Sequence, residues 1–314
     1  MKKLFIISAI ILSLPFGKGW GWASFAQQDV QFTQYMFNTN AVNPAYTGSR
    51  GAISSVALFR TQWVGFEGAP KTQSVNVNSP FLNDKLGIGL TVLNEKIGPL
   101  KQTGIFTDFA YRIKFEKSTL ALGLKAGADV FQAGFSNLNV INSGDNQFQT
   151  NVSSRLLPNL GFGVYYTAEK YYLGFSTPKL VQNNLDVKNG SSQVSQIGVH
   201  KLHYYFIGGF VQDINPFIKF KPTTQIKLTY GAPVSIDANA SFLFYDKLWL
   251  GAMYRFGDAI GLLVQFQFNA QLRAGYSYDY TTSKLNKFNN GTHEIMLGYD
   301  LSFAKEKIRS PRFF

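Results

Sequence analysis

An alternation of apolar and polar residues with a period of two, from about residue 234 to 303, constrains the fold of this chain most. In residues 272–280 the even positions are Leu, Ala and Tyr, whereas the odd positions include Arg273 and Asp279. Successive side chains of a β-strand point to opposite faces, so the pattern predicts strands with one apolar and one polar face. Residues 234–245, 259–268 and 292–303 repeat it, with Leu263 as an apolar exception on the polar face. The fold class is therefore expected to be all-β.

Connection lengths indicate what kind of β-structure this is. The periodicity predicts about 14 strands, near residues 52–63, 71–79, 86–95, 103–114, 118–128, 159–167, 170–176, 201–212, 216–229, 234–245, 247–256, 259–268, 270–280 and 292–303. The connections at 115–117, 168–169, 213–215 and 246 are short. The long connections, at 129–158, 177–200 and 281–291, all fall at the alternate hairpins, so they emerge at the opposite end of the sheet. Outer-membrane barrels have short periplasmic turns and longer extracellular loops. Because an open sheet edge in hydrocarbon would leave backbone groups unpaired, the first and last strands are expected to pair. We expect a single closed antiparallel transmembrane β-barrel over residues 52–303, with both termini periplasmic.

The composition fits a chain with an apolar neighbour. Charged residues make up 15% of the sequence and aromatic residues 16%, whereas soluble proteins have about 25% charged residues. After residue 26, no run approaches the roughly 20 apolar residues that a membrane-spanning helix needs. The composition therefore excludes a helical membrane protein and disfavours an ordinary soluble one.

Residues 1–26 have the layout of a secretory signal peptide. Lys2 and Lys3 precede an apolar run that ends at Phe16, and small residues lead to Gln27. An uncleaved anchor helix is the alternative, but the run is too short to span a bilayer. We expect an integral protein of the bacterial outer membrane, with an N-terminal periplasmic or plug segment at 27–51 and a basic tail at 304–314. An exported protein does not meet nucleic acid. The net charge of +12, about +9 without Lys2, Lys3 and Lys18 of the signal peptide, is interpreted as a basic lumen and basic loops that face anionic lipid headgroups, with a dedicated anionic ligand as the alternative.

Charged residues of the predicted strands fall on the polar face, which would turn toward the barrel lumen. The predicted lumen charges are Asp108, Arg112, Lys125, Asp237, Arg255, Arg273, Asp279, Glu294 and Asp300. They could form an ion path or a docking surface. A mutually neutralising network that fills the interior is the simpler interpretation.

Motifs for catalysis and metal binding are absent from the sequence. His200, His203 and His293 stand in no zinc-type motif, there is no G-x-S-x-G elbow, and there is no cysteine. The Gly-x-Gly units at 87–89 and 161–163 lack the third glycine of a dinucleotide loop and are interpreted as lumen-side glycines that relieve crowding. We expect no enzyme, cofactor or metal site.

The first connection at the long-loop end, residues 61–70, contains two large aromatic residues, Trp63 and Phe66. Exposed aromatic residues on a loop either mark a partner surface or fold inward to close the lumen. Glu67 and Lys71 lie close in sequence and could orient a partner. We therefore predict a partner- or cargo-binding site at Trp63, Phe66, Glu67 and Lys71.

Three sequence blocks resemble the PorP/SprF family of type IX secretion membrane proteins. They are DVQFTQYMFN at 29–38, NPAYTGSRG at 43–51 and RTQWVGFEGAPKTQ at 60–73, and shorter matches follow at 94–99, 278–280 and 291–297. The resemblance implies a non-enzymatic outer-membrane component of the type IX secretion and gliding apparatus, needed for export or surface attachment of cargo adhesins. It further implies contacts with the C-terminal domain of the cargo and, at the periplasmic side, with other secretion components. A passive pore or small-solute transporter is the alternative function.

Overall fold

The computed structural model describes residues 29–82, 84–135, 151–185, 187–189, 192–195 and 199–301. The predicted signal peptide and C-terminal tail lie outside these ranges. In the described part, strands dominate, and the 3-10 helices include η1 (Thr39–Ala41), η2 (Pro44–Tyr46) and η4 (Lys284–Phe288). No helix in these ranges is long and apolar enough to cross a membrane.

The strands follow one another as a meander along the chain. They are β1 (Ile53–Thr61), β2 (Lys71–Phe81), β3 (Leu86–Ile97), β4 (Leu100–Lys114), β5 (Ser118–Ala133), β6 (Val152–Ala168), β7 (Tyr171–Thr177), β8 (Val187–Asn189), β9 (Ser192–Ser195), β10 (His203–Phe210), β11 (Gln212–Asn215), β12 (Ile218–Thr229), β13 (Ser235–Phe244), β14 (Leu248–Arg255), β15 (Ala259–Gln267), β16 (Leu272–Thr281) and β17 (Thr292–Leu301).

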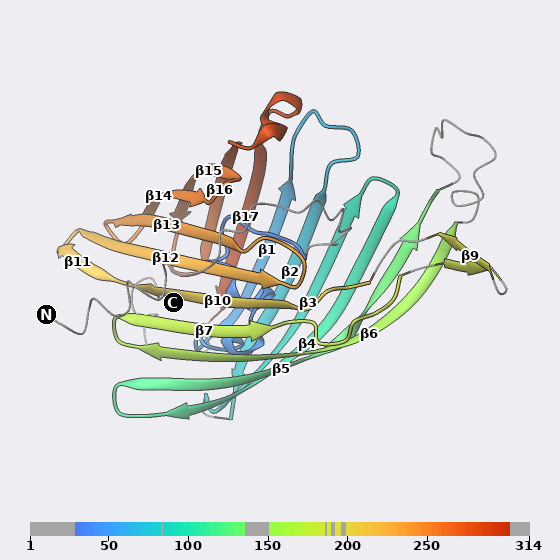
Figure 1. The fold of residues 1–314 in the computed structure, drawn as a ribbon. Coiled ribbons are helices and arrows are strands. Elements are labelled where there is room, and N and C mark those ends of the chain that lie inside the picture. Colours follow the sequence, from blue (N-terminus) through green and yellow to red (C-terminus); the bar gives the residue numbers. More distant parts are fainter. Residues whose placement is uncertain are drawn as a thin grey trace, which may run out of the picture.

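The main sheet closes on itself (Figure 1). Consecutive strands pair antiparallel, β1 pairs with β17, and β10 bridges β7 and β12. β10 and β11 both pair with β12 and are separated only by Val211, so they form one interrupted strand. The result is a closed antiparallel barrel of 14 strands, which confirms the predicted architecture. β8 and β9 form a separate two-stranded sheet.

Several predicted strand boundaries were wrong. Residues 213–215 were predicted as a tight connection, but they belong to β11, and the turn lies at 216–217. The predicted loop at 129–158 is shorter, because β5 continues to Ala133 and β6 begins at Val152. A strand pair that continues beyond the bilayer no longer needs an apolar outer face, so the alternation that marks a strand fades there.

Burial is inverted relative to a soluble protein. Along β16, Arg273 and Asp279 are buried, whereas Tyr276 is 39% exposed on the outer face. The outer face of the barrel carries Phe, Leu, Ile, Val and Tyr side chains, and the buried charges lie on the inner face. The predicted register of this strand is confirmed; a slip by one residue would place every charge in hydrocarbon.

The two ends of the barrel differ. The long-loop end, toward the top and right of Figure 1, has the connections at 62–70, 98–99, 230–234, 256–258 and 282–291, and the connections between β5 and β6 and between β7 and β10 begin and end there. The short-turn end has those at 82–85, 115–117, 169–170, 216–217, 245–247 and 268–271.

Candidate functional site

The described chain begins inside the barrel. Residues 29–51, called the inner segment, run from Asp29 near the long-loop end to Arg50, which contacts Asp300 near the short-turn end of β17. Most of its side chains are buried. It meets the wall on many sides: Asn38 accepts a hydrogen bond from Asn76 of β2, Tyr35 contacts Thr223 of β12, and Val42 accepts one from Ser176 of β7.

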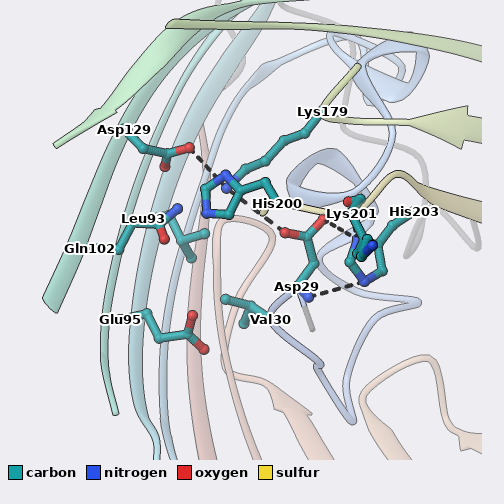
Figure 2. A pocket seen from close by; sticks show the side chains of 10 residues that line it. All are labelled: Asp29, Val30, Leu93, Glu95, Gln102, Asp129, Lys179, His200, Lys201 and His203. Atoms are coloured by element: carbon teal, nitrogen blue, oxygen red, sulfur yellow. Dashed lines mark hydrogen bonds and ion pairs between the residues drawn. The ribbon is translucent and has the colours of Figure 1, made fainter. Parts of the chain in front are cut away.

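A compact charged cluster holds the start of the inner segment (Figure 2). Lys179 lies 3.0 Å from Asp129 of β5 and 3.8 Å from Asp29. The backbone N–H of Asp29 donates to Nε2 of His203 at 3.3 Å. Glu95 and His200 also line the small cavity here, which measures about 20 Å³. The cluster thus ties the N-terminal end of the inner segment to β5, β10 and the loop that follows β7.

The ionisation states of this cluster follow from burial and charge. Burial opposes protonation of Lys179, but Asp29 and Asp129 outweigh it and raise its pKa. Burial, followed by the nearby Lys179 ammonium group, lowers the pKa of His200. No three His, Asp or Glu side chains in the part of the chain that the structure describes converge to hold a metal ion. The cluster therefore acts as an ion-pair anchor in this structure.

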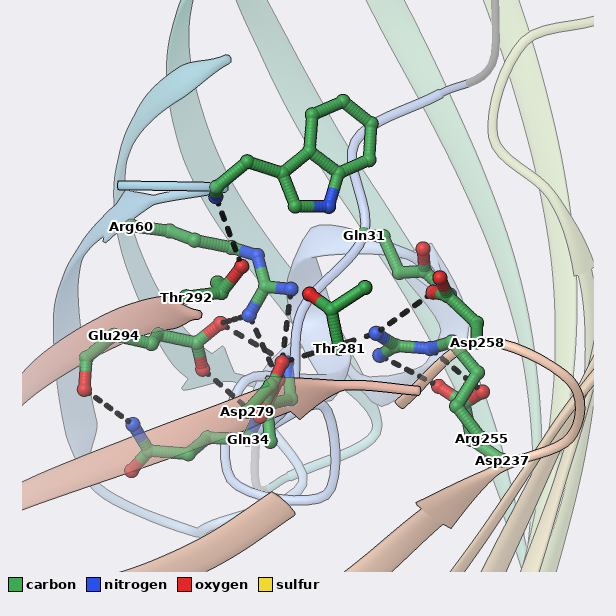
Figure 3. A network of polar contacts seen from close by, with 12 residues as sticks. Gln31, Gln34, Arg60, Asp237, Arg255, Asp258, Asp279, Thr281, Thr292 and Glu294 are labelled. Carbon is green, nitrogen blue, oxygen red and sulfur yellow. Dashed lines mark hydrogen bonds and ion pairs between the residues drawn. The ribbon is translucent and has the colours of Figure 1, made fainter. Parts of the chain in front are cut away.

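A second polar network binds the next residues of the inner segment (Figure 3). The Glu294 carboxylate accepts hydrogen bonds from the backbone N–H groups of Thr33 at 2.9 Å and Gln34 at 2.8 Å. The Arg60 guanidinium group bridges Glu294 at 2.9 Å and Asp279 at 3.0 Å. All of these groups are buried, so each charge faces a charge of opposite sign or a hydrogen-bond partner.

The same network extends along the wall to β13 and β14. Arg255 donates from Nε to Asp237 at 3.0 Å, and its Nη1 lies 3.8 Å from Asp279. The carboxylate of Asp279 therefore stands between two guanidinium groups. Sequence reasoning placed Asp237, Arg255, Asp279 and Glu294 in the lumen but omitted Arg60. Arg60 was hard to assign to the lumen from the sequence, because the apolar residues Val56 and Leu58 precede it on the same inner face of β1.

The remaining predicted lumen charges also face inward. Lys125 pairs with Asp108 at 2.7 Å, and Asp108 accepts a hydrogen bond from Asn40 of the inner segment. Arg112 donates to the carbonyl oxygen of Thr47 at 3.1 Å, also in the inner segment.

At the short-turn end, Asp300 accepts from Arg50 at 2.8 Å and from Arg273 at 2.6 Å. Each of these charge groups therefore contacts the inner segment directly or through its ion-pair partner.

Apolar contacts complete the attachment. Phe32, Tyr35 and Met36 form one buried cluster with Leu58 of β1 and Leu263 of β15. Leu263 was the exception to the alternation, and the cluster supplies its reason: the side chain packs against the inner segment where other lumen positions meet polar groups.

Glycines of the wall make room for the inner segment. A Cβ at Gly123 would collide with the backbone of Pro44 and Ala45, and one at Gly163 would collide with the Asn43 side chain. Of the predicted lumen-side glycines, Gly87, Gly89 and Gly163 lie against the inner segment, whereas Gly161 lies against the backbone of Pro178 in the loop that follows β7.

The predicted partner loop lies at the long-loop end. Trp63, Phe66, Glu67 and Lys71 all line an open cavity of about 1020 Å³, together with Lys96 of β3 and residues of the β3–β4 turn. Phe66 is 46% exposed and Trp63 is partly buried.

Neighbouring connections fix the backbone of this loop. The N–H of Val64 donates to the Gly291 carbonyl at 2.8 Å, and the N–H of Gly98 donates to the Gly68 carbonyl at 2.8 Å. The N–H of Trp63 donates to Oγ1 of Thr292 at 3.1 Å. The cavity is thus bounded by a loop held on both sides.

Comparison with known proteins decides the family. The sequence pattern described as "Type IX secretion system membrane protein PorP/SprF" matches residues 24–299. The chain belongs to the PorP/SprF family. It is an integral outer-membrane protein with a porin-like barrel. A search of curated proteins finds no match.

Solved structures similar to this PorP/SprF chain are outer-membrane channels and porins. The CymD monoaromatic hydrocarbon channel shares 10% identity at a TM-score of 0.50, with 87% of this chain and 93% of that chain covered. The NanC porin shares 10% identity at 0.41, with 80% and 100% covered. Omp33 of Acinetobacter baumannii shares 10% identity at 0.41, with 81% and 99% covered. The likeness to CymD shows the barrel fold alone.

Proposed function

We propose that this protein is a plugged outer-membrane barrel that docks secreted cargo at the cell surface for the type IX secretion apparatus. The cavity at the long-loop end carries the proposal, because it combines an exposed Phe66 with a loop whose backbone is fixed on both sides. Aromatic side chains on a rigid loop bury large area at low entropy cost, which is how binding hot spots gain affinity. In an outer-membrane barrel this end faces the outside of the cell.

The contents of the lumen support docking over transport. The inner segment contacts β2, β7, β12 and β17 and is anchored by buried ion pairs. A passive pore would need a water-filled path where these contacts lie. The other components of the secretion apparatus would meet the short-turn end, which faces the periplasm in this orientation.

The test replaces Trp63 and Phe66 together with alanine in the full-length protein and measures how much adhesin remains on the cell surface. We expect adhesin to appear in the medium while the barrel still shows heat-modifiable electrophoretic mobility, the mark of a folded barrel. A matched control is Tyr230→Ala with Phe288→Ala, because both residues are exposed aromatics on other connections at the same end. The control should retain adhesin at the wild-type level.

Two results would contradict docking at this loop. Full adhesin retention by the folded variant with Trp63→Ala and Phe66→Ala would show that this cavity does not dock the adhesin. Equal release from the control variant would show that any exposed aromatic residue at this end has the same effect.

A further inference from the structure

Three lysines stand side by side on the outer face of the barrel at the long-loop end. The strand register pairs Lys71 of β2 with Lys96 of β3, and Lys96 with Lys101 of β4. All three are exposed, and in each strand the neighbouring positions turn toward the lumen. Directly opposed residues on adjacent strands have Cβ atoms about 5 Å apart, so the row places three ammonium groups close together.

Among the described residues no carboxylate lies within ion-pair distance of the row, and Glu67, which lines the loop cavity with Lys71 and Lys96, pairs with neither. None of the three lysines forms an ion pair within the described ranges, whereas exposed Lys114 at the other end of β4 pairs with Asp84 at 3.7 Å. Like charges placed directly opposite each other destabilise a sheet. Such a row is stable when an anion lies against it.

The side chains below the row form a gradient toward the short-turn end. The next outward row is Gln73, Asn94 and Thr103, in which Asn94 donates to the Thr103 hydroxyl group at 3.3 Å.

The row after that is Val75, Val92 and Ile105. Charge, then amide and hydroxyl groups, then hydrocarbon is the order of polarity across one side of a bilayer, from headgroup to acyl chains. The lysines therefore lie at headgroup height.

The geometry points to a binding site for a phosphate-bearing lipid headgroup on the outer face of β2, β3 and β4. The row faces sideways from the barrel wall, above one polar row and then the apolar side chains, so the group that contacts it belongs to the surrounding leaflet. A phosphorylated headgroup supplies the missing negative charge and several oxygen acceptors. Its acyl chains would lie along Val75, Val92 and Ile105. This inference is independent of cargo docking, although Lys71 and Lys96 also border the loop cavity and only Lys101 lies outside it.

The test compares lipid retention by the folded full-length barrel in detergent micelles, read by native mass spectrometry. The probes are lipid A carrying its phosphate groups and the same lipid after enzymatic dephosphorylation. Wild-type protein should retain the phosphorylated form selectively. The variant with Lys71→Gln, Lys96→Gln and Lys101→Gln should lose retention about tenfold or more, since each lysine near an anionic surface adds to binding.

The matched control changes Lys85, Lys114 and Lys117 to Gln, which removes the same charge from exposed sites at the short-turn end. It should retain the phosphorylated lipid as the wild type does. Equal loss in this control, equal retention of both lipid forms by the wild type, or unchanged retention by the triple variant would each overturn the inference.

Two further measurements distinguish a lipid headgroup from free phosphate and from a protein partner. Inorganic phosphate should displace the lipid no better than sodium chloride of equal ionic strength; selective displacement would mean a site for free phosphate and overturn the lipid assignment. The Lys101→Gln variant keeps Lys71 and Lys96, which both line the loop cavity, and should lose part of the lipid retention while retaining surface adhesin. Loss of adhesin with unchanged lipid binding would assign the row to a protein partner and overturn it likewise.

Discussion

Arg60 of β1 and Glu294 of β17 face each other across the strand pair that closes the barrel, with Nη1 2.9 Å from Oε2. The same carboxylate accepts two backbone hydrogen bonds from the inner segment. One ion pair thus joins the first strand, the last strand and the segment within the lumen.

Replacing Arg60 with methionine should destabilise the barrel. The substitution leaves the buried Glu294 and Asp279 without their guanidinium partner, and breaking a buried pair costs about 3–5 kcal/mol. The urea midpoint of unfolding, followed by heat-modifiable mobility, should fall markedly. Adding Glu294→Gln should recover part of the loss, and Lys117→Met at an exposed turn should change little. An unchanged midpoint for the Arg60 variant would contradict the role of this pair.

The depth of the lipid face can be tested within one strand. Tyr276 lies near the middle of β16 and Tyr280 near its long-loop end, and both face outward. An arginine at the bilayer midplane costs about 2–4 kcal/mol and one near the interface about 0–1. Tyr276→Arg should therefore lower the yield of folded barrel far more than Tyr280→Arg. Equal yields of folded barrel from the two variants would show that Tyr276 lies no closer to the bilayer midplane than Tyr280.

A substitution against the inner segment should open the lumen. Gly123→Ala places a Cβ on the backbone of Pro44 and Ala45, so the inner segment must shift. We expect planar-bilayer currents from this variant and a silent wild type. Gly208→Ala is the control, because its nearest contact is the flexible Leu173 side chain on the outer face, at 3.1 Å. Steady large currents through the wild type would instead favour a pore.

Acid should loosen the start of the inner segment. Burial and then Lys179 hold the pKa of His200 below its ordinary 6.5. Burial opposes ionisation of Asp29, but Lys179 and His203 outweigh it and keep its pKa below 3.8. Both pKa values are depressed in the folded state, so the stability they contribute is present above their ordinary values and is lost as pH falls below them. The first loss therefore begins below about pH 6.5.

Hydrogen exchange measures this loss directly. After correction for intrinsic rates, protection of residues 29–36 should fall between pH 7.5 and pH 5 relative to residues 39–46. The His200→Gln variant should show a flatter dependence. Constant relative protection across this range would contradict the assignment.

The sequence by itself determined the barrel and the face of each strand. Alternation around Arg273 and Asp279 sets which side chains enter hydrocarbon, and a closed sheet satisfies the backbone there. Loop lengths separated the two ends. The sequence blocks at 29–38 and 60–73 indicated which segments carry the family resemblance, but not which residues these segments contact in the fold.

Only the tertiary structure decided what fills the lumen. Residues 29–51 have no strand or helix period, so nothing local to them predicts a path through the barrel. Their position depends on contacts such as Thr33 with Glu294, separated by 261 residues, and on the absence of a side chain at Gly123. The roles of Leu263 and Arg60 also depend on the inner segment that packs against them. An apolar residue on a polar face, or a charge among apolar neighbours, is explained only when the segment packed against it is in place.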